Sequence, residues 1–232
     1  MIGIFDSGVG GLNSLNELRK LLPTADICYF ADRKNAPYGT KTKDELASLV
    51  RRDIEILRGA GADKILIGCC TASAVYKAIS SEYTRDVVPI IEPTAREAYR
   101  LSEKKRIALL STAYTKNSFA FENEVYAIDK SARVFGFIAA ELVSFAEVGE
   151  RDGRLSPEAR LFMERISGLI KDTSADVLIL GCTHFSYFRR TLEDSCGIEC
   201  VCASDVGARV MAEKYRENGT GKTVFTGYSA GL

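Results

Sequence analysis

The sequence predicts an α/β fold of two pseudo-symmetric lobes, each a mostly parallel sheet flanked by helices. Two observations carry this prediction. Short β-branched or aromatic runs alternate with longer stretches of helical periodicity, a pattern typical of parallel sheets covered by helices. In addition, the segment ADKILIGC at 62–69 returns as ADVLILGC at 175–182, with residue types that differ only at Lys64 and Val177. This internal repeat indicates two lobes of similar build.

The expected strands follow one another along the chain, each before a helical stretch. They comprise residues 2–5, 27–30, 64–67, 88–91, 106–110, 134–138, 177–180 and 199–202. Apolar stripes at helical spacing lie between them and indicate core faces rather than binding surfaces. One such stripe consists of Ala159, Phe162, Met163, Ile166 and Ile170. We expect the first lobe at 1–92, the second at 93–204, and a C-terminal segment at 205–232.

Composition narrows the classes of function. The chain has 232 residues, of which 31 are basic and 31 acidic, so no net charge attracts a nucleic acid or an anionic membrane surface. No run of roughly 18 or more apolar residues predicts a membrane span. The beginning MIGIFDSGVG does not resemble a signal peptide, so we expect a cytoplasmic protein. The seven cysteines are an odd number in an unexported chain and are expected to be free thiols.

Two of these thiols stand out by position. Each copy of the repeat ends in Gly-Cys, which places Cys69 and Cys182 at the carboxyl ends of central strands, just before a helix. Ligands of parallel α/β sheets bind outside the carboxyl ends of the strands. Two similar lobes that face each other would therefore present the two thiols from opposite walls of one cleft, with the active site between the lobes.

Two opposed thiols suit the inversion of a tetrahedral carbon. A helix N-terminus and nearby hydroxyl groups stabilise a thiolate and lower the pKa of a cysteine from about 8.5 toward neutrality. One thiol can then remove a proton from the carbon while the other delivers a proton to its opposite face. This chemistry needs no metal and no cofactor, pyridoxal phosphate included. The hydroxyl groups of Thr71 and Thr183 are natural donors to a substrate carboxylate.

Five segments resemble, in order, the signature segments of the glutamate racemase family. They are FDSGVGGL at 5–12, PYG at 37–39, GCCTAS at 68–73, IEPTA at 91–95 and LGCTHF at 180–185. The resemblance implies two pseudo-symmetric α/β lobes, with residues 205–232 returning to the first lobe. It also implies a cofactor-independent two-thiol racemase of glutamate that supplies D-glutamate for peptidoglycan.

The resemblance also implies roles for individual residues. Cys69 and Cys182 match the two catalytic thiols, Asp6 assists the first thiol, and His184 supports the second. The positions that match substrate contacts are Asp6, Ser7, Tyr38, Gly39, Cys70, Thr71, Thr183 and His184. One position departs from the family, because Cys70 stands where an asparagine is usual, and a thiol is a weaker hydrogen-bonding group than an amide.

Several alternatives stay open at this point. The chain could racemise aspartate or another acidic amino acid, since a pocket discriminates one methylene by only about 1–3 kcal/mol. It could be a catalytically weakened binding protein because of Cys70. The set Cys69, Cys70, Cys182 and His184 also has the composition of a structural zinc site, which would make the protein a metal-binding or redox module. The expected partner is a small acidic amino acid, and a homodimer is the commonest assembly for such proteins.

Overall fold

The computed structural model describes residues 1–83, 86–215 and 219–227. The chain divides into two compact units. One comprises Met1–Ile90 together with the chain from Ser204 onward, and the other comprises Ile91–Ala203. Each unit is an α/β layer structure around one parallel sheet, as predicted.

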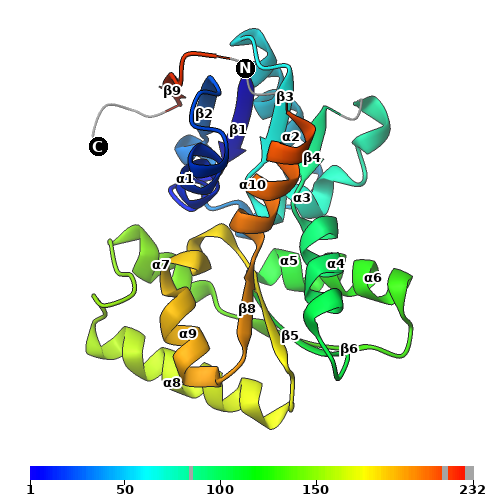
Figure 1. The fold of residues 1–232 in the computed structure, drawn as a ribbon, viewed down its shortest axis with the longest axis vertical. Helices are drawn as coiled ribbons and strands as arrows, with labels where there is room; N and C mark the ends of the chain where they lie inside the picture. Colours follow the sequence, from blue (N-terminus) through cyan, green and yellow to red (C-terminus); the bar gives the residue numbers. More distant parts are fainter. Residues whose placement is uncertain (84–85, 216–218, 228–232) are drawn as a thin grey trace. The chain divides into compact units, whose positions relative to one another are not determined.

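The first unit contains a five-stranded sheet in the order β4-β3-β1-β2-β9, in which every neighbouring pair is parallel. Its strands are β1 (Ile2–Asp6), β2 (Ile27–Ala31), β3 (Lys64–Ile67), β4 (Val87–Pro89) and β9 (Thr223–Thr226). Its helices are α1 (Leu12–Leu21), α2 (Lys43–Gly59), α3 (Cys70–Tyr76) and nearly all of α10 (Ala203–Lys214), with 3₁₀ turns η1 (Arg33–Asn35), η2 (Tyr38–Thr40) and η3 (Ser80–Glu82). Figure 1 shows β9, from the end of the chain, beside β2.

The second unit contains a four-stranded parallel sheet in the order β6-β5-β7-β8. Its strands are β5 (Arg106–Ser111), β6 (Arg133–Ile138), β7 (Val177–Gly181) and β8 (Glu199–Cys202). Its helices are α4 (Ile91–Leu101), α5 (Ala113–Asn117), α6 (Ala120–Ile128), α7 (Ala140–Glu147), α8 (Pro157–Asp172) and α9 (Arg189–Cys196), with the 3₁₀ segment η4 (Thr183–Phe188).

The two sheets share one connectivity. The order β4-β3-β1-β2 of the first corresponds to β8-β7-β5-β6 of the second, and β9 is an addition to the first. In this correspondence β3 and β7, the strands of the repeated segment, are equivalent. The residue before each of these strands also makes the same main-chain hydrogen bond to the neighbouring strand segment. The N–H of Asp63 donates to the Met1 carbonyl at 3.1 Å, and the N–H of Asp176 donates to the Arg106 carbonyl at 3.0 Å. The predicted pseudo-symmetry is confirmed.

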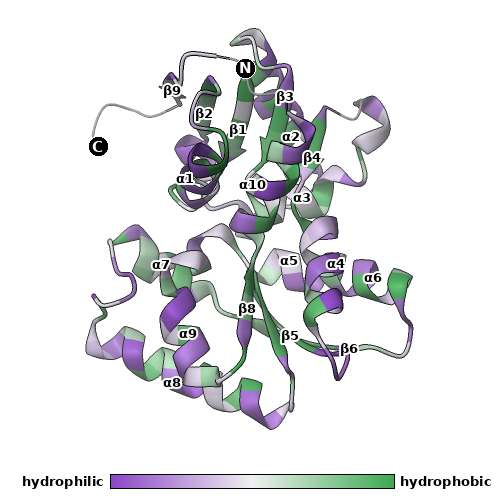
Figure 2. Cartoon of the chain, in the orientation of Figure 1, coloured by the Kyte–Doolittle hydropathy of each residue, from purple (hydrophilic) through white to green (hydrophobic). Residues whose placement is uncertain are grey.

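Burial explains why the strands appear as apolar runs. Every residue of β1, β2 and β7 is buried, and a strand buried on both faces favours apolar side chains, to which Asp6 at the end of β1 is an exception. Figure 2 shows much of β1, β3 and β4 in green. The helices instead bury one face and expose the other. On α8 the apolar stripe is buried at Ala159, Met163, Ile166 and Ile170, and Phe162 is half-buried. The stripe is a core face, as expected.

Local signals set where the helices begin. Helix α2 starts with a capping box, in which the Thr42 hydroxyl accepts the Glu45 N–H and the Glu45 carboxylate accepts the Thr42 N–H. Helix α8 starts after Ser156, whose hydroxyl accepts the Ala159 N–H, and has proline in its first turn. In the described part of the chain, no helix combines the length and apolarity that crossing a membrane requires.

Two strand predictions need correction. The run at 88–91 is a strand only as far as Pro89, and Ile91 already begins helix α4, because a short apolar run does not reveal where a buried strand passes into a buried helix. Strand β9 was not predicted. Its sequence, TVFT, is short, and Val224 and Phe225 are exposed, so it lacks the buried pattern of the other strands.

Candidate active site

The first unit gathers three predicted site residues at one edge of its sheet. Parallel strands end at the same edge, and β1 pairs with β3 so that Phe5 lies opposite Ile67. Ser7 follows β1 and Cys69 follows β3, and the Ser7 Oγ lies 3.9 Å from the Cys69 Sγ, in hydrogen-bond contact for sulfur. Asp6, at the end of β1, is fully buried and accepts the Gly8 N–H at 2.7 Å. The carboxylate thereby stabilises the turn that carries Ser7.

Gly11 permits the tight packing of this turn. A Cβ atom at position 11 would lie 2.5 Å from the Cβ of Asp6 and 2.7 Å from the Oη of Tyr29, too close for any real side chain. The Tyr29 hydroxyl in turn donates to the Gly8 carbonyl at 3.0 Å. Glycine at position 11 therefore lets the start of helix α1 approach Asp6 directly.

Cys69 stands at the junction between β3 and α3. Its backbone is extended, with φ −123° and ψ 122°, and its carbonyl accepts the Ser73 N–H at 2.8 Å, so it is the residue that caps the helix. Cys70 and Thr71 form the first turn of α3, and both side chains are buried. The residue that departs from the family therefore lies inside the fold, directly after the first thiol.

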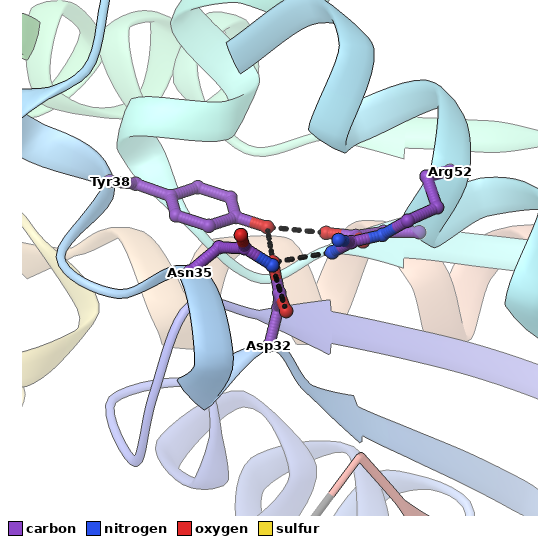
Figure 3. A network of polar contacts seen from close by, with 5 residues as sticks. Asp32, Asn35, Tyr38 and Arg52 are labelled. Carbon is purple, nitrogen blue, oxygen red and sulfur yellow. Dashed lines mark hydrogen bonds and ion pairs between the residues drawn. The ribbon is translucent and has the colours of Figure 1, made fainter. Parts of the chain in front are cut away.

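Tyr38 belongs to a polar network of the same unit, drawn in Figure 3. It begins η2, is buried, and directs its hydroxyl to Asp32 Oδ2 at 2.7 Å and to Asp53 Oδ2 at 2.6 Å. Asp32 follows β2, and its N–H donates to the Asp6 carbonyl at 2.9 Å, so this network adjoins the sheet edge that holds Asp6. Gly39 follows Tyr38 in η2 and is half-buried.

The second unit places the other thiol in an equivalent position with different neighbours. Cys182 follows β7 and is buried, with its backbone extended before η4. Its Sγ lies 3.7 Å from Nδ1 of His184, and Nε2 of His184 lies 2.7 Å from Oε1 of Glu147, the last residue of α7. Thr183 and His184 are both buried.

This chain of contacts is compatible with proton transfer from the thiol. A neutral imidazole that donates its Nε2 hydrogen to the Glu147 carboxylate presents Nδ1 as an acceptor toward Cys182. Transfer of that proton gives a thiolate beside an imidazolium, and the imidazolium lies against the carboxylate, which stabilises the charged form. Cys182 thus has a proton acceptor in contact with it, and Cys69 contacts the Ser7 hydroxyl.

Sequence reasoning missed three acidic residues of these sites. Glu147 lies 37 positions from His184, and no motif or spacing connects them. Asp32 could have been found, because it follows the end of β2 much as Asp6 ends the neighbouring strand β1, and parallel strands bring such residues to one edge. Asp53 is hidden in an amphipathic helix, where an acidic residue normally indicates a solvated face.

The remaining four cysteines have structural positions. Cys28 lies in β2, Cys200 and Cys202 lie in β8 and Cys196 at the end of α9, and all four are buried. Burial raises the pKa of the Cys196 and Cys200 thiols, which keeps them protonated. Across residues 1–83, 86–215 and 219–227, no group of three or more His, Cys, Asp or Glu side chains has a metal-binding arrangement.

Comparison with known proteins identifies the family. The Asp/Glu/Hydantoin racemase family matches residues 15–211. A glutamate racemase of Desulforudis audaxviator is 37% identical over 214 residues, which cover 92% of this chain and 77% of that protein.

Solved structures agree. The glutamate racemase isoform RacE1 of Bacillus anthracis matches with a TM-score of 0.87 and 25% identity, over 97% of this chain and 86% of that one. The glutamate racemase of Thermus thermophilus, solved with β-chloro-D-alanine, matches with a TM-score of 0.84 and 27% identity over the same shares. The resemblance seen in the signature segments is confirmed, and the chain belongs to the Asp/Glu/hydantoin racemase family.

Proposed function

We propose that this chain interconverts L- and D-glutamate by proton transfer at Cα between two thiols, Cys69 and Cys182, without a cofactor. The observation that supports this most is the equivalence of β3 and β7. Each of these strands is followed by a buried cysteine, and each thiol contacts a polar partner, Ser7 in one unit and His184 in the other. A duplicated thiol with two different partners suits a reaction that uses an acid and a base in alternation.

The proposed reaction has two proton transfers. The Cys69 thiolate removes the α-proton of one enantiomer and becomes a thiol, leaving a carbanion at Cα. The Cys182 thiol then gives its proton to the opposite face of that carbon and becomes a thiolate. The reverse reaction exchanges these roles, and His184 takes up the Cys182 proton when this thiol must start as the base. Thr71 and Thr183 contribute hydroxyl donors to the substrate carboxylate, and Asp6 assists Cys69.

The substrate is assigned by similarity. The Desulforudis, Bacillus and Thermus relatives all bear the name glutamate racemase, which favours glutamate over aspartate or a non-catalytic binding role. D-Glutamate for peptidoglycan would be the product in the cytoplasm, where the precursors of the cell wall are assembled. The small acidic amino acid is the expected partner.

Incubation with L- or D-glutamate in deuterated water tests the proposal. The wild-type chain should produce the other enantiomer with deuterium at Cα. Cys69→Ser and Cys182→Ser should each abolish inversion, while each keeps Cα exchange with one enantiomer only, because one face still meets a thiol. A serine variant that racemises at the wild-type rate would exclude the two-thiol mechanism. Exchange with aspartate and none with glutamate would reassign the substrate.

A further inference from the structure

The first unit contains a buried polar cluster that the two-thiol mechanism does not use. It consists of Asp32, Tyr38, Arg52 and Asp53, with Asn35 at its margin (Figure 3). Asp53 is fully buried in helix α2, and Asp32 and Tyr38 are nearly so. Two carboxylates in the interior of a protein require donors and compensating charge, since burying an ion without a partner is costly.

The number of protons in this cluster is constrained by its geometry. The Tyr38 hydroxyl carries one hydrogen, yet its oxygen lies 2.7 Å from Asp32 Oδ2 and 2.6 Å from Asp53 Oδ2. With both carboxylates ionised, one of these short contacts would join two lone pairs. A second hydrogen, on one of the carboxyl groups, resolves both contacts: the acid donates to Tyr38, and Tyr38 donates to the other carboxylate.

The donors around the carboxyl groups indicate which one holds that hydrogen. Asp32 accepts the Asn35 side-chain amide at 2.9 Å on Oδ1 and the Arg52 guanidinium at 2.5 Å on Oδ2, which suits an ionised group. Asp53 accepts two N–H groups of Arg52 on Oδ1, at 2.6 and 3.1 Å, while its Oδ2 faces only the phenol among the contacts described, which suits an oxygen that carries the hydrogen. Burial raises the pKa of Asp53 to about 6, although the hydrogen bonds from Tyr38 and Arg52 oppose this shift.

This cluster connects helix α2 to the segment that precedes it. The chain between Arg33 and Lys41 makes short-range main-chain bonds, from Ala36 N–H to the Arg33 carbonyl and from Lys41 N–H to the Tyr38 carbonyl. The Tyr38 hydroxyl adds a long-range attachment, because Asp53 lies 15 positions further along the chain. Gly39, which the family resemblance places at the substrate, is the next residue after Tyr38.

We propose that Arg52 and Asp53 are positioning residues for substrate binding, which hold Tyr38 and hence Gly39 in place through a hydrogen shared between Asp53 and the phenol. Neither residue needs to touch the substrate. The inference rests on the proposed function, because it takes Tyr38 and Gly39, the substrate contacts that the family resemblance implies, as contacts of glutamate. Loss of the attachment should weaken binding of glutamate more than it slows the proton transfers, since the thiols belong to other segments.

Two pairs of variants test the arrangement. Arg52→Ala should raise KM for glutamate about tenfold and change kcat by less than about threefold, the effect of losing charge-assisted hydrogen bonds. Arg51→Ala is the matched control, because Arg51 is adjacent on α2, is equally exposed and pairs with Glu82 instead. Below about pH 6, where Asp53 carries its proton, Asp53→Asn should keep KM within about twofold, since the amide donates to Tyr38 as the acid does, whereas Asp53→Ala should raise KM about tenfold.

The outcomes separate the alternatives. If Arg52→Ala and Asp53→Ala lower the melting temperature but leave KM unchanged, the cluster is merely structural and the inference is wrong. If Asp53→Asn raises KM as much as Asp53→Ala does, the proposal of a hydrogen shared between Asp53 and Tyr38 is wrong. The ¹³C carboxyl resonance that disappears in Asp53→Asn gives a second readout, because its chemical shift should titrate near pH 6 instead of near 3.8. A wild-type chain that racemises no acidic amino acid would overturn the proposed function, and with it the positioning role, whatever this resonance shows.

Discussion

Replacement of Glu147 by glutamine isolates the charge behind the second thiol. The carboxylate lies 2.7 Å from Nε2 of His184, whose Nδ1 lies 3.7 Å from the Cys182 Sγ. Glutamine keeps an oxygen that can accept the Nε2 hydrogen, so the tautomer is retained. It removes only the charge that stabilises the imidazolium formed when Cys182 gives up its proton.

The size of the effect follows from the hydrogen bond. A bond to a charged group contributes about 1.5–3 kcal/mol and a neutral one about 0.5–1.5, so the charge accounts for about 1–1.5 kcal/mol, or roughly tenfold in rate. His184 is buried, but 36% of the Glu147 side chain is exposed, and water screens part of the interaction. We therefore expect Glu147→Gln to lower kcat/KM by about threefold to tenfold, and Glu147→Ala to lower it further.

Isotope effects distinguish this mechanism from a general loss of activity. The equilibrium constant between enantiomers is one, so kcat/KM must fall equally in both directions. With α-deuterated glutamate, however, slowing the Cys182 step should raise the isotope effect on kcat/KM in the direction where Cys182 is the base and lower it in the other. Glu141→Gln, an exposed position on the same helix α7, is the control. Isotope effects that change equally in both directions would refute the role given to Glu147.

Three further predictions concern the first unit. Cys70→Asn should restore an amide donor in the first turn of α3 and lower KM for glutamate by up to about tenfold; steady-state kinetics that show no gain would indicate a pocket adapted to the thiol. Gly11→Ala should cost about 1–3 kcal/mol in the free energy of unfolding, because its Cβ would clash with Asp6, whereas Gly59→Ala, with open space around it, should stabilise by up to about 1 kcal/mol in the same denaturant titration. Because the pKa of Asp53 rises from 3.8 to about 6 on folding, the folded chain binds the extra proton in this window. The free energy of unfolding should therefore fall by about 3 kcal/mol as the pH rises from below 3.8 to above 6. Asp53→Asn should remove this pH dependence.

Much of the candidate site could be predicted because it follows from strand ends. The repeat at 62–69 and 175–182 ends in Gly-Cys in both copies, and a parallel strand delivers its next residue to the carboxyl edge of the sheet. The strand ending in Asp6 therefore had to bring Ser7 toward Cys69 once β1 and β3 paired. His184 was predictable in the same way, from its place two residues after Cys182.

Contacts between distant segments needed the tertiary structure. The sequence by itself determined the strand and helix alternation, the duplicated lobe and the two thiols, because each of these is written in local periodicity or in a repeated segment. Only packing decided that Glu147 ends its helix beside His184, that Asp53 meets the Tyr38 hydroxyl, and that β9 adds itself to β2. The physical reason is that such pairs are set by how whole helices and strands lie against one another, and a single acidic residue on a helix appears the same in sequence whether it faces water or a buried phenol.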